Sequence, residues 1–69
     1  MNNRAEITTR LAKRLKDERT TKGLSLDALA KLSGVSRSML SQIERGESSP
    51  TVASLWNLTR ALNVDFSTL

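Results

Sequence analysis

The sequence contains no cysteine and no histidine, and these two absences exclude several classes of protein. The chain lacks the usual zinc ligands and has no disulfide, so it is neither a zinc finger nor a disulfide-stabilised domain. It also has no paired carboxylates and no glycine-rich phosphate loop, which leaves no nucleophile, base or metal site of the usual kinds. We therefore expect the protein not to be an enzyme and to need no cofactor.

Long apolar runs are also missing. No stretch approaches the roughly 20 apolar residues of a transmembrane helix. The polar start MNNRAEITTR is unlike a signal peptide. These features predict a cytoplasmic protein with no membrane partner. The chain shows no internal repeat and no alternating strand pattern, and this favours an all-α fold.

The apolar spacing, the caps and the glycines predict helices over residues 7–22, 26–33, 37–45 and 50–62. The chain of 69 residues is long enough for one domain, which we expect over residues 7–69 after a tail at 1–6. A fifth helix is expected to begin at Asp65 or Ser67. The residues expected to face inward from the first and last of the four helices are Ile7, Leu11, Leu15, Val52, Leu55, Leu58 and Leu62.

Residues 25–45 form the most informative segment. Ser25 and Ser36 are good N-caps for two short helices, and Gly34 supplies the positive φ that ends the first of them. The small side chain of Ala30 permits the close approach that so short a turn requires. Two helices joined in this way have the spacing of a helix-turn-helix, whose DNA-binding version lays its second helix in the major groove.

A family resemblance rests on this segment. The residues that carry it are Leu29, Ala30, Gly34, Val35, Leu40 and Ile43. Their spacing resembles that of phage-repressor and Cro-like regulators, the XRE family. The run SGVSRSMLSQIERGESSPTVASLWNLTRALNV is similar to the N-terminal domain of bacterial XRE regulators that carry a cupin sensor domain downstream.

The resemblance implies a compact four- to five-helix, lambda-repressor-like DNA-binding domain. The implied function is sequence-specific binding to double-stranded DNA as a bacterial transcriptional regulator, with residues 37–45 as the recognition helix. No cupin follows in this sequence, and we expect it to be truncated. A small-molecule effector is thus implied only through the missing C-terminal domain.

One charged pair is predicted inside the domain. Arg19 lies four residues after Leu15, and Glu44 lies four residues after Leu40, so both charges fall on inward-facing stripes. Buried together, they would form a bidentate pair. The resemblance implies the same Arg–Glu bridge between the first helix and the recognition helix. The alternative is two surface charges whose alkyl stems pack on the domain.

Arg37, Ser38 and Gln42 are the expected base contacts. In this docking mode the start of the recognition helix and the next turn reach base edges. Arg37 suits guanine, Gln42 suits adenine and Ser38 accepts either partner. Arg37 has an alternative role as a phosphate clamp.

Phosphate contacts are predicted for small polar groups around the recognition helix and for one arginine, namely Ser25, Ser36, Ser41, Arg45 and Ser48. For each serine, capping or solvent exposure is an equally good interpretation. The resemblance also implies a polar or basic residue just after the Ser25 cap, where this chain has Leu26. That departure removes one phosphate contact.

The basic charge is concentrated in residues 1–22, which carry seven Lys or Arg and three acids. This excess would attract DNA and make binding weaken as the salt concentration rises. Alternatively, Arg10, Lys13 and Lys16 form a solvated helix face.

Partner surfaces remain open at the level of sequence. Met39 is expected to be a partly buried filler rather than a thymine contact. Trp56, Phe66 and Leu69 either cover the core or anchor a dimer or a downstream domain. We expect the full-length protein to form a homodimer. The alternative function is an antitoxin-like or other protein-interaction module on the same fold.

Overall fold

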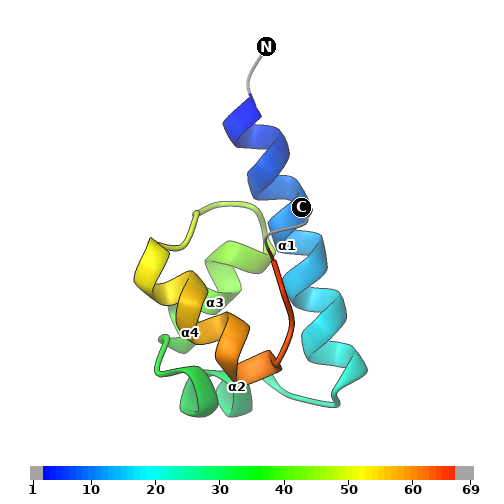
Figure 1. The fold of residues 1–69 in the computed structure, drawn as a ribbon, viewed down its shortest axis with the longest axis vertical. Helices are drawn as coiled ribbons and strands as arrows, with labels where there is room; N and C mark the ends of the chain where they lie inside the picture. Colours follow the sequence, from blue (N-terminus) through cyan, green and yellow to red (C-terminus); the bar gives the residue numbers. More distant parts are fainter. Residues whose placement is uncertain (1–2, 67–69) are drawn as a thin grey trace.

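A computed structural model describes residues 3–66, and these form four α-helices with no strand among them. The helices are α1 (Asn3–Thr21), α2 (Leu26–Ser33), α3 (Arg37–Glu44) and α4 (Val52–Leu62) (Figure 1). Helix α3 packs against α1 and α2, and α2 also packs against α4. The predicted all-α fold is confirmed. In the part of the chain that the structure describes, no helix combines the length and the apolar composition of a membrane span.

The α2–turn–α3 unit has the geometry that its caps predict. The Ser25 side chain accepts from the Ala28 amide at 3.0 Å, and that of Ser36 accepts from the Met39 amide at 3.1 Å. Gly34 has φ +75°, the left-handed conformation, and its amide donates to Ala30 O at 2.9 Å. The chain therefore leaves α2 and enters α3 within three residues.

Helix α1 begins at Asn3, before the expected start near Ile7, so residues 3–6 extend the helix. The expectation that Ile7 faces the core is wrong, since it is 55% exposed. The reason lies in the arrangement of the helices: the first turns of α1 project beyond the other three (Figure 1). The inward stripe starts one turn later, at the buried Leu11 and Leu15.

Helix α4 begins later than predicted. Its N-cap is Thr51, whose side chain accepts from the Ser54 amide at 3.1 Å. The sequence predicts a start at Pro50 with Ser49 as the N-cap, because proline favours the first helical position, but both residues lie in the preceding loop. Thr51 has the extended φ and ψ that a cap requires, so it satisfies the first free amides of the helix in place of Ser49. Val52 is 87% exposed rather than inward, because the first turn of α4 lies beyond the edge of the core.

The core is a single cluster of apolar side chains from all four helices, from the turn between α2 and α3, and from the segment after α4. Its members are Leu11, Leu15, Leu29, Val35, Leu40, Ile43, Leu58, Leu62 and Phe66. The chain after α4 runs back along α1 (Figure 1), where the Arg14 guanidinium lies 5.7 Å from the centre of the Phe66 ring. Asp65 and Phe66 are not helical, so the expected fifth helix does not begin at Asp65. Ser67 and Leu69 lie outside the described residues.

Candidate nucleic-acid interface

Helix α3 has one face in the core and one polar face on the surface. Leu40 and Ile43 are almost completely buried and fix the helix against its neighbours. The other face borders a shallow surface depression lined by Arg37, Ser38, Ser41, Gln42 and Arg45. The structure thus brings together the three expected base contacts and two of the expected phosphate contacts on one surface.

Arg37 lies at the start of this face and forms an ion pair with Asp27 of α2. Its Nε is 3.0 Å from Asp27 Oδ1, and the two side chains are 65% and 72% exposed. Within residues 3–66, neither Nη1 nor Nη2 of Arg37 donates a hydrogen bond. The end of the guanidinium is therefore available to a ligand.

Gln42 lies one turn further along and is oriented by the loop after α3. The Ser48 hydroxyl donates to Gln42 Oε1 at 2.9 Å. This bond leaves the Gln42 amide nitrogen as a donor toward the surface. It also occupies the Ser48 hydrogen, so a phosphate contact by Ser48 requires the hydroxyl to turn.

Arg45 forms a different kind of pair. It contacts Glu47 through Nε at 3.1 Å and through Nη2 at 3.2 Å. Both side chains are 57% exposed. One side of the Arg45 guanidinium is therefore already occupied, and Nη1 donates no hydrogen bond within residues 3–66.

Arg19 and Glu44 are brought together in the bidentate arrangement expected from their spacing. Arg19 Nε and Nη2 donate to the two Glu44 carboxylate oxygens at 2.7 and 2.9 Å, and Nη1 donates to Leu24 O at 2.8 Å. The side chains are only 13% and 7% exposed. Hydrogen bonding to Glu44 raises the pKa of Arg19 above its ordinary value. This pair joins α1 to the end of α3 and thereby fixes the orientation of α3, and with it the direction of its polar face.

The expected phosphate contacts lie at the edges of the face. Ser25 and Ser36 are exposed N-caps, so each hydroxyl oxygen accepts from the helix while its hydrogen remains available. Ser41 is half-buried on α3. Both interpretations of the serines, capping and ligand contact, are compatible with these positions.

Two residues were missed at the level of sequence. Asp27 was not expected at the site, because its contact with Arg37 joins two helices and no periodicity indicates it. Ser33 is the other: its buried hydroxyl donates to Leu29 O at 2.8 Å and accepts from the Val35 amide at 3.1 Å. Its position directly before Gly34 was the available signal, since serine hydroxyls often close turns.

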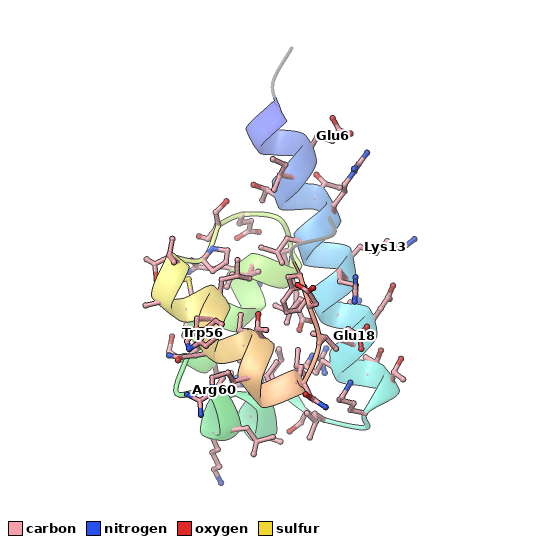
Figure 2. The ribbon with its side chains drawn as sticks, in the orientation of Figure 1. Glu6, Lys13, Glu18, Trp56 and Arg60 are labelled. Carbon is pink, nitrogen blue, oxygen red and sulfur yellow. The ribbon has the colours of Figure 1, made fainter. Side chains whose placement is uncertain are left out.

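Helix α4 carries an exposed apolar patch, whereas Met39 belongs to the core. Met39 is half-buried and packs on the core cluster, as expected of a filler. Trp56 is 61% exposed and borders a shallow apolar pocket with Val52, Leu55 and Phe66. Figure 2 shows Trp56 with Arg60 on α4, and Lys13 extending from α1 away from the helical bundle.

Comparison with known proteins gives concordant matches. A family model described as Helix-turn-helix (HTH_3) matches residues 15–69. The HTH-type transcriptional regulator SutR of Escherichia coli strain K12 is 57% identical over 58 residues, which cover 84% of this chain and 33% of SutR.

Two solved structures are also similar. An HTH_3 family transcriptional regulator from Vibrio cholerae has a TM-score of 0.85 and 52% identity, over 91% of this chain and 35% of that protein. The restriction-modification controller protein C.AhdI from Aeromonas hydrophila has a TM-score of 0.80 and 36% identity, over 86% of this chain and 89% of that protein. This chain spans about a third of the length of SutR and of the Vibrio cholerae regulator. The chain therefore belongs to the XRE-type helix-turn-helix family.

Proposed function

We propose that this chain binds double-stranded DNA in a sequence-specific manner as the DNA-binding part of a bacterial transcriptional regulator. The observation that carries the proposal is the polar face of α3. Arg37 and Ser38 are exposed there and Gln42 is half-buried beside them, while Leu40 and Ile43 are buried on the opposite face. A short helix held in this way fits the major groove.

The base contacts follow from the donors and acceptors on this face. Arg37 donates from its guanidinium end to O6 and N7 of guanine, and Gln42 pairs with N6 and N7 of adenine. Ser38, exposed beside Arg37, contributes a hydroxyl that can donate or accept a hydrogen bond. The Ser48 contact holds the Gln42 amide in one orientation.

The phosphate contacts surround the base contacts. The hydroxyls of Ser25, Ser36 and Ser41 and the free side of Arg45 meet the backbone. A phosphate contact by Ser48 replaces its hydrogen bond to Gln42, so it gives up the orientation that this bond provides. The positive ends of α2 and α3 lie at Ser25 and Ser36 and add to the attraction for phosphate.

Specificity requires more bases than one short helix reads. We propose that the full-length protein binds as a homodimer, with two copies of α3 on half-sites about 34 Å apart. An effector, if it regulates binding, acts through a domain beyond the 69 residues.

The test is selection from a random pool of DNA duplexes at two salt concentrations. We expect one enriched motif, with weaker recovery at the higher salt concentration. Arg37→Ala should then cost about 1–3 kcal/mol of binding free energy on the selected site and little on random DNA. Absence of enrichment at both salt concentrations would contradict the proposed function.

A second candidate function is protein interaction, as in an antitoxin. The observation that favours it is the exposed apolar patch at Val52 and Trp56. In that case Trp56→Ala would abolish binding of the protein partner, and Arg37→Ala would leave it unchanged.

A further inference from the structure

Asp27 is an unexpected residue at a surface that is proposed to meet DNA. Its side chain is 72% exposed and lies two residues after Ser25, the N-cap proposed to contact phosphate. A negative charge there repels the DNA backbone and weakens phosphate binding. Its stabilising effect on the first turn of α2 does not require contact with Arg37. The pairing with Arg37 is therefore the feature that needs an explanation.

The geometry of the pair suggests that explanation. Asp27 Oδ1 approaches Arg37 at Nε, 3.0 Å away, on the side of the guanidinium. The end of the group, formed by Nη1 and Nη2, makes no hydrogen bond within residues 3–66. A guanidinium held by its side presents two parallel N–H donors from its end, the arrangement that matches O6 and N7 of guanine.

Arg45 provides a comparison on the same face. Glu47 contacts it at both Nε and Nη2, so the acid already occupies one complete edge of that guanidinium. The two arginines of the face thus have carboxylate neighbours that engage them differently. Only the pairing at Arg37 leaves the guanidinium end unoccupied.

We propose that Asp27 is a specificity-determining positioning residue, which holds Arg37 by Nε so that its free end reads a guanine rather than moving to a phosphate. The proposal rests on the proposed function, because it needs α3 to lie in the major groove. Without Asp27, the exposed Arg37 side chain would be free to rotate toward the nearest phosphate. The protein would then bind DNA more tightly overall and distinguish sequences less well.

The test compares the unmodified chain with Asp27→Asn, which removes the charge and keeps the size of the side chain. Binding is measured by fluorescence anisotropy on the selected duplex, on duplexes substituted at each base pair in turn, and on a random duplex. For Asp27→Asn we expect binding to the random duplex to strengthen by roughly two- to five-fold, the range of an exposed ion pair. Discrimination at the base pair that is sensitive to Arg37→Ala should fall by a similar factor. The dependence of log K on log salt concentration should steepen by about one phosphate contact.

Glu47→Gln is the matched control, since it removes one carboxylate charge beside the other arginine of the face. We expect it to change the affinity for all duplexes by the same factor and to leave base discrimination intact. The double variant Asp27→Asn/Arg37→Ala should discriminate no less than Arg37→Ala alone, because Asp27 acts through Arg37. Thermal unfolding followed by circular dichroism verifies that each variant is folded.

Two outcomes would overturn the proposal. If Asp27→Asn keeps full discrimination at the Arg37-sensitive base pair, Asp27 acts only through its charge, and the proposed function stands without it. If the unmodified chain enriches no motif, the proposed function fails and the role of Asp27 fails with it.

Discussion

The arginines of this domain differ in how much of each guanidinium is already used. Arg19 donates from all three of its nitrogens and is nearly buried, so it holds two helices together. Arg37 pairs with Asp27 at Nε and donates no hydrogen bond from Nη1 or Nη2 within residues 3–66, and Arg45 is paired along one side. The same residue type thus stabilises the fold at one position and remains available for recognition at another, and burial decides which.

Breaking the Arg19–Glu44 pair should destabilise the domain strongly. Glu44→Ala leaves the Arg19 guanidinium largely buried without its carboxylate, and we expect a loss of about 3 kcal/mol in the free energy of unfolding. Urea unfolding followed by circular dichroism measures it. The double variant Arg19→Met/Glu44→Leu removes both charges and should recover most of the loss. An unchanged midpoint for Glu44→Ala would show that the pair contributes nothing to stability.

At the scale of elements, the turn between α2 and α3 determines the orientation of the polar face. Three local features stabilise the turn: the left-handed backbone of Gly34, the N-cap Ser36 and the two hydrogen bonds of the Ser33 hydroxyl. Each contribution is local, so a substitution at Gly34, Ser36 or Ser33 should destabilise the α2–turn–α3 unit without changing the packing of the core.

Gly34→Ala isolates the contribution of backbone conformation. A Cβ at this position would meet no atom within 4 Å, so the cost comes from φ +75° alone. We expect a loss of about 1–2 kcal/mol in the free energy of unfolding. Gly34→Asn should cost less, because Asn tolerates the left-handed conformation, as Asn63 does at the end of α4 with φ 55°. Equal losses for the two variants would contradict the conformational explanation.

Ser33→Ala tests the hydrogen bonds at the same turn. The substitution leaves the Val35 amide without its acceptor in a buried position, and we expect a loss of about 1–3 kcal/mol in the free energy of unfolding. Chemical denaturation gives the value. The control is Ser49→Ala, on the exposed loop before α4. It removes a hydrogen bond with the Thr8 hydroxyl that water can replace, so stability should change by less than about 0.5 kcal/mol.

At the scale of the whole molecule, the net charge is +4, and many of the basic residues lie on α1. The Lys13 side chain of α1 points away from the bundle (Figure 2). Arg10 is paired with Glu6 at 2.6 Å, and Arg14 and Lys22 both donate to Glu18, whose pKa these hydrogen bonds lower. This arrangement favours the interpretation of α1 as a solvated face.

Lys13→Gln should therefore affect DNA binding only at low salt concentration. At physiological ionic strength charges more than about 8 Å apart are screened, so the affinity for the selected site should stay the same. At about 0.01 M salt the screening length is roughly 30 Å, and the affinity should fall measurably. Anisotropy titrations of Lys13→Gln and Arg45→Gln at both salt concentrations check this. A loss for Lys13→Gln at physiological salt would place α1 in contact with DNA.

Most of the local structure is predictable from the sequence. The bounds of α2 agree with the expectation, and Ser25, Ser36 and Gly34 occupy their expected cap and turn positions. The end of α1 before Gly23 and the inward positions Leu58 and Leu62 also follow. These features depend on neighbours three or four residues apart, which the sequence displays directly.

Other features could not be predicted, because they depend on how the helices are placed relative to one another in three dimensions. Ile7 and Val52 have the right spacing for the core but lie past its edges. The predicted start of α4 at residue 50 is wrong, because Thr51 has the extended backbone and the side-chain hydrogen bond of the N-cap. At the candidate interface the residue types were expected, whereas the contacts of Arg37 with Asp27 and of Gln42 with Ser48 were not.

The sequence by itself determined the class of this protein: an all-α chain with a capped, glycine-hinged pair of helices and the residues of its polar face. Periodicity and capping act over single turns, so they are encoded locally. Only the tertiary structure decided which charges are buried and which remain available. Packing α1 against α3 closes Arg19 onto Glu44, and packing α2 against α3 brings Asp27 to one side of Arg37 and leaves its end open.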